Sequence, residues 1–165
     1  MVITCSIFSL FLNRLIIWHL QNKQTQITIL IITMENNFDN KNPKQTKKTI
    51  LITEDQESNF MLLEVLLGIW GVNTIRACNA QEAVDMCNEN KKIDLVLMDI
   101  RLPDFSGLEA TRLIKNVHPD LPIIAQTAYA IIGDREKALD AGCNEYITKP
   151  IRKDKLFELL ERFLG

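Results

Sequence analysis

Polar side chains that could perform acid, metal or phosphate chemistry stand at the ends of four apolar runs in this sequence. Glu54 and Asp55 come directly after the run TILIT, and Asp99 ends the run IDLVLMD. Thr127 ends the run PIIAQT, and Lys149 follows the run EYIT. Each of these residues alone is typical of a cap or a loop that follows a strand. The acids among them have a common requirement: a carboxylate that leaves water needs a partner that compensates its charge.

The three carboxylates would repel one another if they met at one edge of a sheet. Two like charges about 4 Å apart repel by roughly 4 kcal/mol at an effective dielectric constant near 20. The single ammonium of Lys149 is too little to balance three acids, so the cluster requires a metal cation. Mg²⁺ is the expected ion because it prefers hard oxygen ligands, retains several waters and is commonly held by one or two carboxylates together with a phosphate.

A carboxylate at such a site can act as a nucleophile toward phosphorus. We expect Asp99 to place one oxygen on the metal and the other toward solvent, and to form an aspartyl phosphate. Asp55 would hold the metal, and Glu54 would orient its waters. Lys149 and Thr127 would then face the phosphoryl oxygens. Phosphoryl transfer depends on positioning and charge neutralisation more than on acid–base groups, so this chemistry requires no catalytic histidine.

Five apolar runs that alternate with helical patterns must bring these side chains together. The run IDLVLM has no polar face, which is typical of a strand in a parallel sheet covered by helices on both sides. The order predicts a doubly wound (βα)5 α/β domain, in which ligands bind outside the carboxyl ends of the strands. The predicted strands are 49–53, 73–78, 93–98, 122–127 and 145–148, and the predicted helices are 59–69 (closed by Gly68 and Gly71), 80–90, 108–117, 131–141 and 153–164.

The amino-terminal segment, residues 1–33, has a different composition from the rest of the chain. It contains no acidic side chain, and its only charged residues are Arg14 and Lys23. Three interpretations remain open: a membrane anchor, a secretory signal, or a segment without a structural role upstream of a start at Met34. A spanning helix requires about 20 apolar residues, and a signal carries its positive charge ahead of the apolar stretch. Because Arg14 interrupts the run, we favour the third interpretation.

The length and charge of the chain limit the number of domains and the kinds of partner that we expect. A chain of 165 residues, 47% of them hydrophobic, suits one globular domain of about 100–150 residues with additional chain. We assign residues 48–165 to this domain and residues 34–47 to a polar, disordered lead-in. The 19 basic and 21 acidic side chains create no strong field for nucleic acid, so no direct nucleic acid binding is expected. Membrane association is expected only if residues 1–33 act as an anchor.

The cysteines indicate the redox compartment. Cys5, Cys78, Cys87 and Cys143 form no C-x-x-C pair and no metal-binding spacing with either histidine. This usage is typical of core and surface residues in a reducing compartment, so a cytoplasmic location is expected.

Four motifs together resemble those of a known family. The segments ILITEDQ, LVLMDIRLPDFSG, AQTAYA and EYITKP are similar to the four signatures of the response-regulator receiver domain of two-component signalling, over essentially all of residues 48–165. The segment AQTAYA most resembles receivers of hybrid sensor histidine kinases. The resemblance implies a flavodoxin-like fold with strand order 2-1-3-4-5. It also implies phosphorelay signalling, with phosphoryl transfer to Asp99 from a phosphohistidine on a sensor histidine kinase or histidine phosphotransfer protein.

The resemblance also implies roles for individual residues at the metal site. Asp55, Asp99 and the backbone carbonyl of Arg101 would bind Mg²⁺, and Glu54 would bind it through water. Lys149 would pair with the phosphoryl group. Such a receiver is a signalling protein that catalyses its own aspartyl phosphorylation and dephosphorylation, and it is not a metabolic enzyme.

Further roles implied by the resemblance concern switching and the persistence of the signal. Thr127 and Tyr146 would form the switch pair, and the peptide bond before Pro150 would be cis. Arg101 and Tyr129 would flank the approach of the hydrolytic water and slow dephosphorylation. Since no effector domain follows the fifth helix, output is expected to pass to a partner protein through the surface formed by the fourth helix, the fifth strand and the fifth helix.

Alternatives to this interpretation come from three classes. A phosphatase or phosphomutase with an aspartyl nucleophile would require a second acid two residues after Asp99, where Arg101 stands. A flavodoxin-type flavin carrier would require a Ser/Thr/Gly-rich phosphate loop after the first strand, where the acidic segment EDQESN stands. A pseudo-receiver that never takes phosphate and acts as a protein-interaction module stays open as the alternative within the family.

Overall fold

The computed structural model describes residues 47–89, 92–128 and 134–165. They belong to the second of two contact units, Thr46–Gly165. The predictions for residues 1–33 and for the lead-in as far as residue 46 lie outside the described residues. The strands are β1 (Thr49–Thr53), β2 (Asn73–Ala77), β3 (Leu95–Asp99), β4 (Ile123–Thr127) and β5 (Glu145–Thr148), and the helices are α3 (Glu57–Trp70), α4 (Ala80–Asn88), α5 (Gly107–Val117), α6 (Asp134–Asp140) and α7 (Lys153–Leu164).

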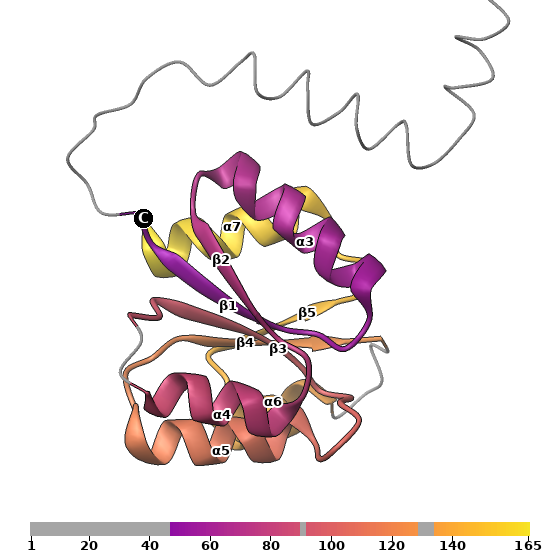
Figure 1. Ribbon diagram of the computed structural model, residues 1–165. Helices are drawn as coiled ribbons and strands as arrows, with labels where there is room; N and C mark the ends of the chain where they lie inside the picture. Colours follow the sequence, from indigo (N-terminus) through magenta and orange to yellow (C-terminus); the bar gives the residue numbers. More distant parts are fainter. Residues whose placement is uncertain (1–46, 90–91, 129–133) are drawn as a thin grey trace, which may run out of the picture. The chain divides into compact units, whose positions relative to one another are not determined.

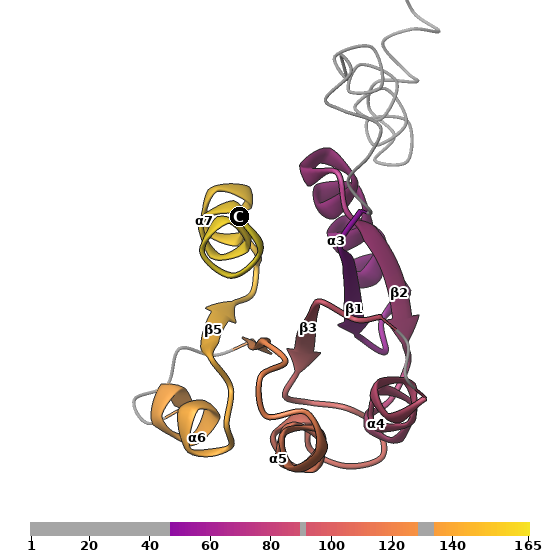
Figure 2. The same ribbon diagram turned by 90° about the vertical axis from the view of Figure 1, so that its left-hand side faces the viewer.

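The five strands form one parallel sheet in the order β2-β1-β3-β4-β5. The predicted α/β class and strand order are therefore confirmed. Helices α3 and α7 cover one face of the sheet, and α4, α5 and α6 cover the other (Figures 1 and 2). The winding reverses between β1 and β3, and the carboxyl ends of strands at such a switch point are where α/β sheets bind ligands.

Two apolar layers fix the sheet between its helices. The layer beneath α4 and α5 contains Leu51, Val96 and Met98, and the layer beneath α3 and α7 contains Ile52 and Leu97. Every residue of β3 and β4 is buried, because helices cover both faces of a parallel sheet. This packing sets the strand register, and the register brings the carboxyl ends of the strands to one edge.

Several elements end at different residues from those predicted. Helix α3 continues through Gly68, and Gly71 alone ends it, with a φ of 93° in the left-handed region that glycine adopts without strain. Strand β3 is shifted toward the carboxyl end relative to the predicted 93–98, so Asp99 is its last residue. Helix α6 ends at Asp140, and its predicted start at residue 131 lies outside the described residues.

The membrane-anchor interpretation concerns residues 1–33, which the structure does not describe. Among residues 47–89, 92–128 and 134–165, no helix has both the length and the apolar character needed to cross a bilayer.

Candidate active site

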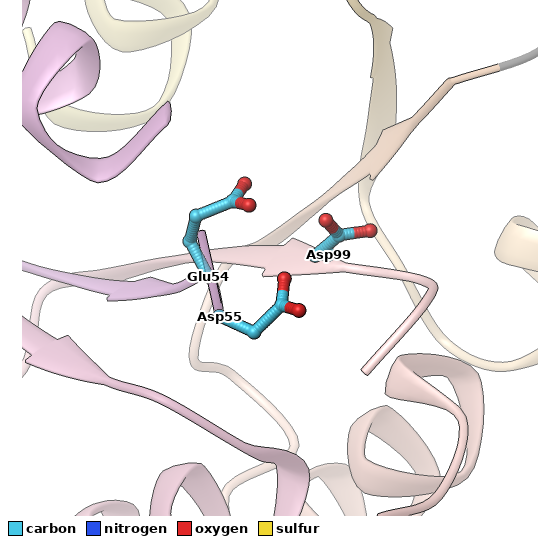
Figure 3. Close-up of side chains that lie close together, drawn as sticks. All are labelled: Glu54, Asp55 and Asp99. Atoms are coloured by element: carbon cyan, nitrogen blue, oxygen red, sulfur yellow. The ribbon is translucent and has the colours of Figure 1, made fainter. Parts of the chain in front are cut away.

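Three acidic side chains meet at the carboxyl ends of β1 and β3. Glu54 and Asp55 are the first two residues after β1, and Asp99 is the last residue of β3. One carboxylate oxygen from each lies within 4.8 Å of the other two, and the three carboxylates are directed toward a shared space (Figure 3). Glu54 is fully buried, Asp99 is 6% exposed and Asp55 is exposed. The three acids therefore converge, as the predicted strand arrangement required.

Lys149 enters the cluster from the carboxyl end of β5 and bridges two of the acids. Its Nζ donates hydrogen bonds to Glu54 Oε2 at 2.6 Å and to Asp99 Oδ2 at 2.5 Å. The peptide bond between Lys149 and Pro150 is cis, as the resemblance implied. The ammonium thus contacts the carboxylates directly, so phosphoryl oxygens would have to compete with them for it.

The other oxygens of the two buried acids also have partners. Asp99 Oδ1 accepts a hydrogen bond from the Arg101 backbone N–H at 2.9 Å. Glu54 Oε1 accepts from the side-chain amide of Asn59 at 2.9 Å. Both oxygens of Asp99 therefore have a protein hydrogen-bond donor, and the orientation of one of them toward solvent in the metal-bound site stays a prediction. Asn59 was not predicted; its position in the first turns of the helix that follows the acid pair is the only signal in the sequence.

Burial and ion pairing act in opposite directions on the ionisation of this cluster. Burial raises the pKa of Asp99 above its ordinary value, and the hydrogen bonds from Lys149 and the Arg101 N–H offset only part of that rise. Burial lowers the pKa of Lys149, but the hydrogen bonds to Asp99 and Glu54 outweigh it, and the net pKa is raised. Lys149 therefore remains an ammonium at neutral pH and carries the positive charge in the cluster.

The donor set suits a small, hard divalent cation. Mg²⁺ binds oxygen at about 2.0–2.1 Å in octahedral geometry, so ligands on opposite sides of the ion lie roughly 4.2 Å apart. The spread of up to 4.8 Å among the three acids is slightly larger. One ion could be held here by a small inward movement of the side chains, or with one acid bound through water. Glu54, Asp55 and Asp99 are thus the residues that could hold Mg²⁺.

The predicted switch residues, Thr127 and Tyr146, lie on the neighbouring strands β4 and β5. The Thr127 carbonyl accepts a hydrogen bond from the Lys149 backbone N–H at 2.7 Å. Tyr146 pairs in register with Ala125 of β4, and Ala125 and Thr127 share a face because side chains alternate along a strand. The half-buried Tyr146 therefore lies on the same face of the sheet as Thr127.

Two further predicted residues concern dephosphorylation. Arg101 follows β3 and has an exposed side chain, and its backbone contacts Asp99. Tyr129 lies outside the described residues.

Comparison with known proteins identifies a family that matches this fold and site. Residues 50–161 match the response regulator receiver domain family. The chain therefore belongs to this family, whose members are receivers of two-component signalling.

Individual relatives match over most of their own length. The polar-differentiation response regulator DivK of Brucella anthropi is 42% identical over 120 residues, which cover 72% of this chain and 97% of DivK. Among solved structures, the receiver domain of the sensor histidine kinase PA1611 from Pseudomonas aeruginosa is 37% identical with a TM-score of 0.67, covering 73% of this chain and 99% of that one; it has a magnesium ion coordinated in its active-site cleft. The receiver domain of Ssk1 from Saccharomyces cerevisiae, solved with the histidine phosphotransfer protein Ypd1, is 32% identical with a TM-score of 0.66, covering 71% of this chain and 88% of that one.

Proposed function

We propose that this protein is the phosphoacceptor of a two-component or phosphorelay pathway, in which Asp99 receives a phosphoryl group from a phosphohistidine. The observation that carries the proposal is the contact between Lys149 and Asp99 inside the acidic cluster. This contact supports the proposal because the Asp99 carboxylate, the proposed nucleophile, lies beside an ammonium that could bind phosphoryl oxygens. The neighbouring Glu54 and Asp55 supply the further acids that a metal requires.

In the proposed step, a carboxylate oxygen of Asp99 attacks phosphorus. A P–O bond forms, the P–N bond of the donor breaks, and its electron pair returns to the imidazole nitrogen, which regenerates the donor histidine. Asp99 Oδ2 accepts from Lys149 and Oδ1 accepts from the Arg101 N–H. Each oxygen retains a second lone pair for the attack. Lys149, which also contacts Glu54, is suited to follow the phosphoryl oxygens.

Bound Mg²⁺ would supply neutralisation of the charge on the phosphoryl oxygens. The proposed direct ligands are Asp55, Asp99 and the Arg101 carbonyl, with Glu54 acting through water. The exposed carboxylate of Asp55 has fewer constraints on its side chain and suits direct binding.

The proposed donor is a sensor histidine kinase or a histidine phosphotransfer protein. Two solved relatives support this class of partner: one is the receiver of a sensor histidine kinase with magnesium in its cleft, and the other was crystallised with a histidine phosphotransfer protein. We place the reaction in the cytoplasm, a reducing compartment that suits the free thiols of Cys78, Cys87 and Cys143. The receiver is proposed to catalyse its own phosphorylation and dephosphorylation.

Output is proposed to pass to a partner protein through the surface formed by α6, β5 and α7. On phosphorylation, Thr127 would turn toward the phosphate and the ring of Tyr146 would move into the space it leaves. The ion pairs of Glu145 are consistent with a surface that can rearrange. Glu145 Oε1 lies 3.9 Å from Arg135 Nη2 on α6, and Glu145 Oε2 lies 3.3 Å from Arg162 Nη1 on α7. Exposed ion pairs of this kind contribute about 0–1 kcal/mol each, so a small displacement of α6 is sufficient to break one.

The aspartyl phosphate is proposed to persist. Arg101 and Tyr129 are bulky side chains at the two positions that flank the approach of the hydrolytic water, and an exposed guanidinium two residues after Asp99 could cover the phosphoryl group. Slow intrinsic decay suits a relay or a sustained response.

Treatment with Mg²⁺ and acetyl phosphate tests the proposed function. Intact-mass spectrometry should detect the addition of one phosphoryl group to the wild type and none to Asp99→Asn, because the substitution removes the proposed nucleophile beside Lys149. After removal of the donor, the modified protein should decay slowly in Mg²⁺ without a partner. Its decay should be faster in the double variant Arg101→Asn, Tyr129→Glu.

Asp120→Asn is a matched control for this experiment. Asp120 is an exposed aspartate before β4, at the opposite edge of the sheet, so the control should be labelled as the wild type is. Labelling that survives in Asp99→Asn would assign the phosphoryl group to another residue. A wild type that takes no phosphoryl group would favour the pseudo-receiver.

A further inference from the structure

The guanidinium of Arg76 holds the backbone that carries the acid pair. Arg76 lies near the end of β2, in register with Ile52 of β1. Its Nε donates a hydrogen bond to the Glu54 carbonyl oxygen at 3.2 Å, and its Nη2 donates to the Asp55 carbonyl oxygen at 3.1 Å. The Glu54 carbonyl belongs to the peptide that precedes Asp55, and the Asp55 carbonyl belongs to the peptide that follows it. One side chain thus fixes both peptide groups that flank the Asp55 Cα.

Two further contacts keep the guanidinium itself in place. Its Nη1 forms an ion pair with Glu57 in the first turn of α3. Its Cζ lies 4.7 Å from the centre of the ring of Phe60, which is one turn after Glu57 in α3, and this is a cation–π contact. The Arg76 side chain is only 19% exposed. Arg76 therefore connects three elements: strand β2, the loop after β1 and helix α3.

The two acids of the pair depend on this contact to different degrees. Glu54 is fully buried and its own carboxylate is held by Lys149 and Asn59. Asp55 is exposed, so the direction of its Cα–Cβ bond is set by the peptide groups on either side of it. When those peptides are fixed, the position of the Asp55 carboxylate depends only on its own side-chain rotamers. A residue that supports a metal ligand orients it in this way.

We infer that Arg76 is a positioning residue for the metal site, which holds the backbone of Asp55 so that its carboxylate faces Asp99. This inference rests on the proposed function, because it assigns to Asp55 the role of metal ligand. It requires arginine and not merely a positive charge. A lysine has no planar fork with which to donate to two carbonyls at once, and it stacks less well on an aromatic ring.

The decisive comparison is between Arg76→Lys and Glu57→Gln, measured by calorimetric titration with Mg²⁺. Removing a supporting residue of a metal ligand typically weakens metal binding by about 10–100-fold. We expect Arg76→Lys to weaken Mg²⁺ binding about tenfold. Glu57→Gln removes the ion-pair partner but leaves both carbonyl contacts, and it should stay within about twofold of the wild type. Wild-type affinity in Arg76→Lys, or equal losses in both variants, would overturn the inference.

Phosphorylation by acetyl phosphate separates positioning from a general loss of structure. In Arg76→Lys the Mg²⁺ concentration for half-maximal rate should rise about tenfold, and the rate at saturating Mg²⁺ should return close to that of the wild type. A merely structural role predicts a lower rate at every Mg²⁺ concentration, together with a lower melting temperature. Phe60→Leu retains Arg76 but removes the ring beneath it, so it should give a smaller shift of the same kind even if Arg76→Lys folds poorly.

A measurement without metal distinguishes failure of this inference from failure of the proposed function. Hydrogen exchange of the Gln56 amide, which faces Glu54 Oε1 at 3.4 Å, should be faster in metal-free Arg76→Lys than in the wild type or Glu57→Gln. If the wild type binds no Mg²⁺, the proposed function fails, whereas the exchange rates still report whether Arg76 holds this backbone. Unchanged exchange in Arg76→Lys would overturn the inference whatever the metal result.

Discussion

Two loops deliver acids to the same cluster, and different forces hold them. The loop after β1 carries Glu54 and Asp55, and it is held by the Arg76 side chain of the neighbouring strand. The loop after β3, residues 100–106, is held by backbone packing at Gly107, whose N–H donates to the Ile100 carbonyl at 3.0 Å. A side chain built at Gly107 would place its Cβ 1.9 Å from the Asp99 carbonyl oxygen. Lack of space at Gly107 therefore fixes the backbone of Asp99, the proposed nucleophile, whereas side-chain hydrogen bonds hold the backbone of Asp55, the proposed metal ligand.

This difference has a consequence for how the two loops tolerate change. Side-chain hydrogen bonds are replaced one at a time, each with a net effect of about 0.5–1.5 kcal/mol. A side chain at Gly107 that collides with the backbone cannot reduce stability in such small steps, because the main chain at Asp99 must move. The loop after β1 is thus the adjustable side of the site, and the loop after β3 is the rigid side. The following substitutions test this contrast, beginning with the largest expected effect.

Gly107→Ala should damage the rigid side most severely. Overpacking a close contact costs about 1–3 kcal/mol and sometimes more, and this contact is with backbone, so we expect a loss near the upper end, about 3 kcal/mol in the free energy of unfolding. Phosphorylation of Asp99 should fall as well, because the strand end must shift. Urea denaturation and labelling by acetyl phosphate measure the two effects.

Gly68→Ala is the matched control for that substitution. Gly68 lies inside α3 with nothing within 4 Å of a Cβ, so alanine there should stabilise the protein by about 0.5–1 kcal/mol. If Gly107→Ala proved as stable as the wild type, backbone packing would not be what holds the loop after β3.

Lys149→Met removes the cation that joins the two loops. Both Glu54 and Asp99 would then be buried without their shared partner. Breaking a buried ion pair costs about 3–5 kcal/mol, and partial solvent access reduces this here to roughly 2 kcal/mol in metal-free solution. Because a divalent cation can replace the missing charge, the loss should be smaller with Mg²⁺. Thermal denaturation with and without Mg²⁺ measures both values.

Lys155→Met provides the comparison for the lysine. Lys155 forms an ion pair with the exposed Glu158 on α7, and its replacement should change stability by less than about 0.5 kcal/mol. A metal-free Lys149→Met protein as stable as this control would show that the two acids do not depend on the ammonium.

Substitution of Asp104 should have the smallest effect on the free energy of unfolding, and this effect should depend on pH. Its carboxylate accepts hydrogen bonds from the backbone N–H groups of Ala80 and Gln81 at the start of α4, both at 2.9 Å. Desolvation raises the pKa of Asp104, but the backbone hydrogen bonds together outweigh it and hold the pKa below its ordinary value. A lowered folded-state pKa means that the stabilisation is present above the unfolded pKa of about 3.9 and is lost as the pH falls through the folded value.

We therefore expect Asp104→Asn to reduce the free energy of unfolding by a few tenths of a kcal/mol to about 1 kcal/mol at pH 6. The difference from the wild type should shrink as the pH falls from about 4 through the lowered folded-state pKa, below which Asp104 is protonated in both states of the wild type. Denaturation of both proteins from pH 6 to pH 3 provides the measurement. A difference that grew toward low pH would contradict the role of the ionised carboxylate.

The sequence by itself determined the class of fold and which side chains meet in the acidic cluster. The apolar run that ends at Asp99 and the run EYIT are local patterns, and local hydrophobic periodicity is sufficient to predict buried strands. Helix α7 begins and ends at the predicted residues, 153 and 164. Because all strands are parallel, residues that follow them had to meet at one edge, which brought Glu54, Asp55 and Lys149 to Asp99.

Only the tertiary structure decided which neighbours hold those residues. Gly68 and Gly71 are equally plausible helix ends in the sequence, and packing places the left-handed turn at Gly71. Arg76 reaches the Glu54 carbonyl across 22 positions of sequence, and this contact exists because the β1–β2 register sets Arg76 beside the end of β1. Lys149 likewise reaches Asp99 across 50 positions of sequence. Such contacts depend on register and on side-chain direction in three dimensions, and neither is encoded in local periodicity.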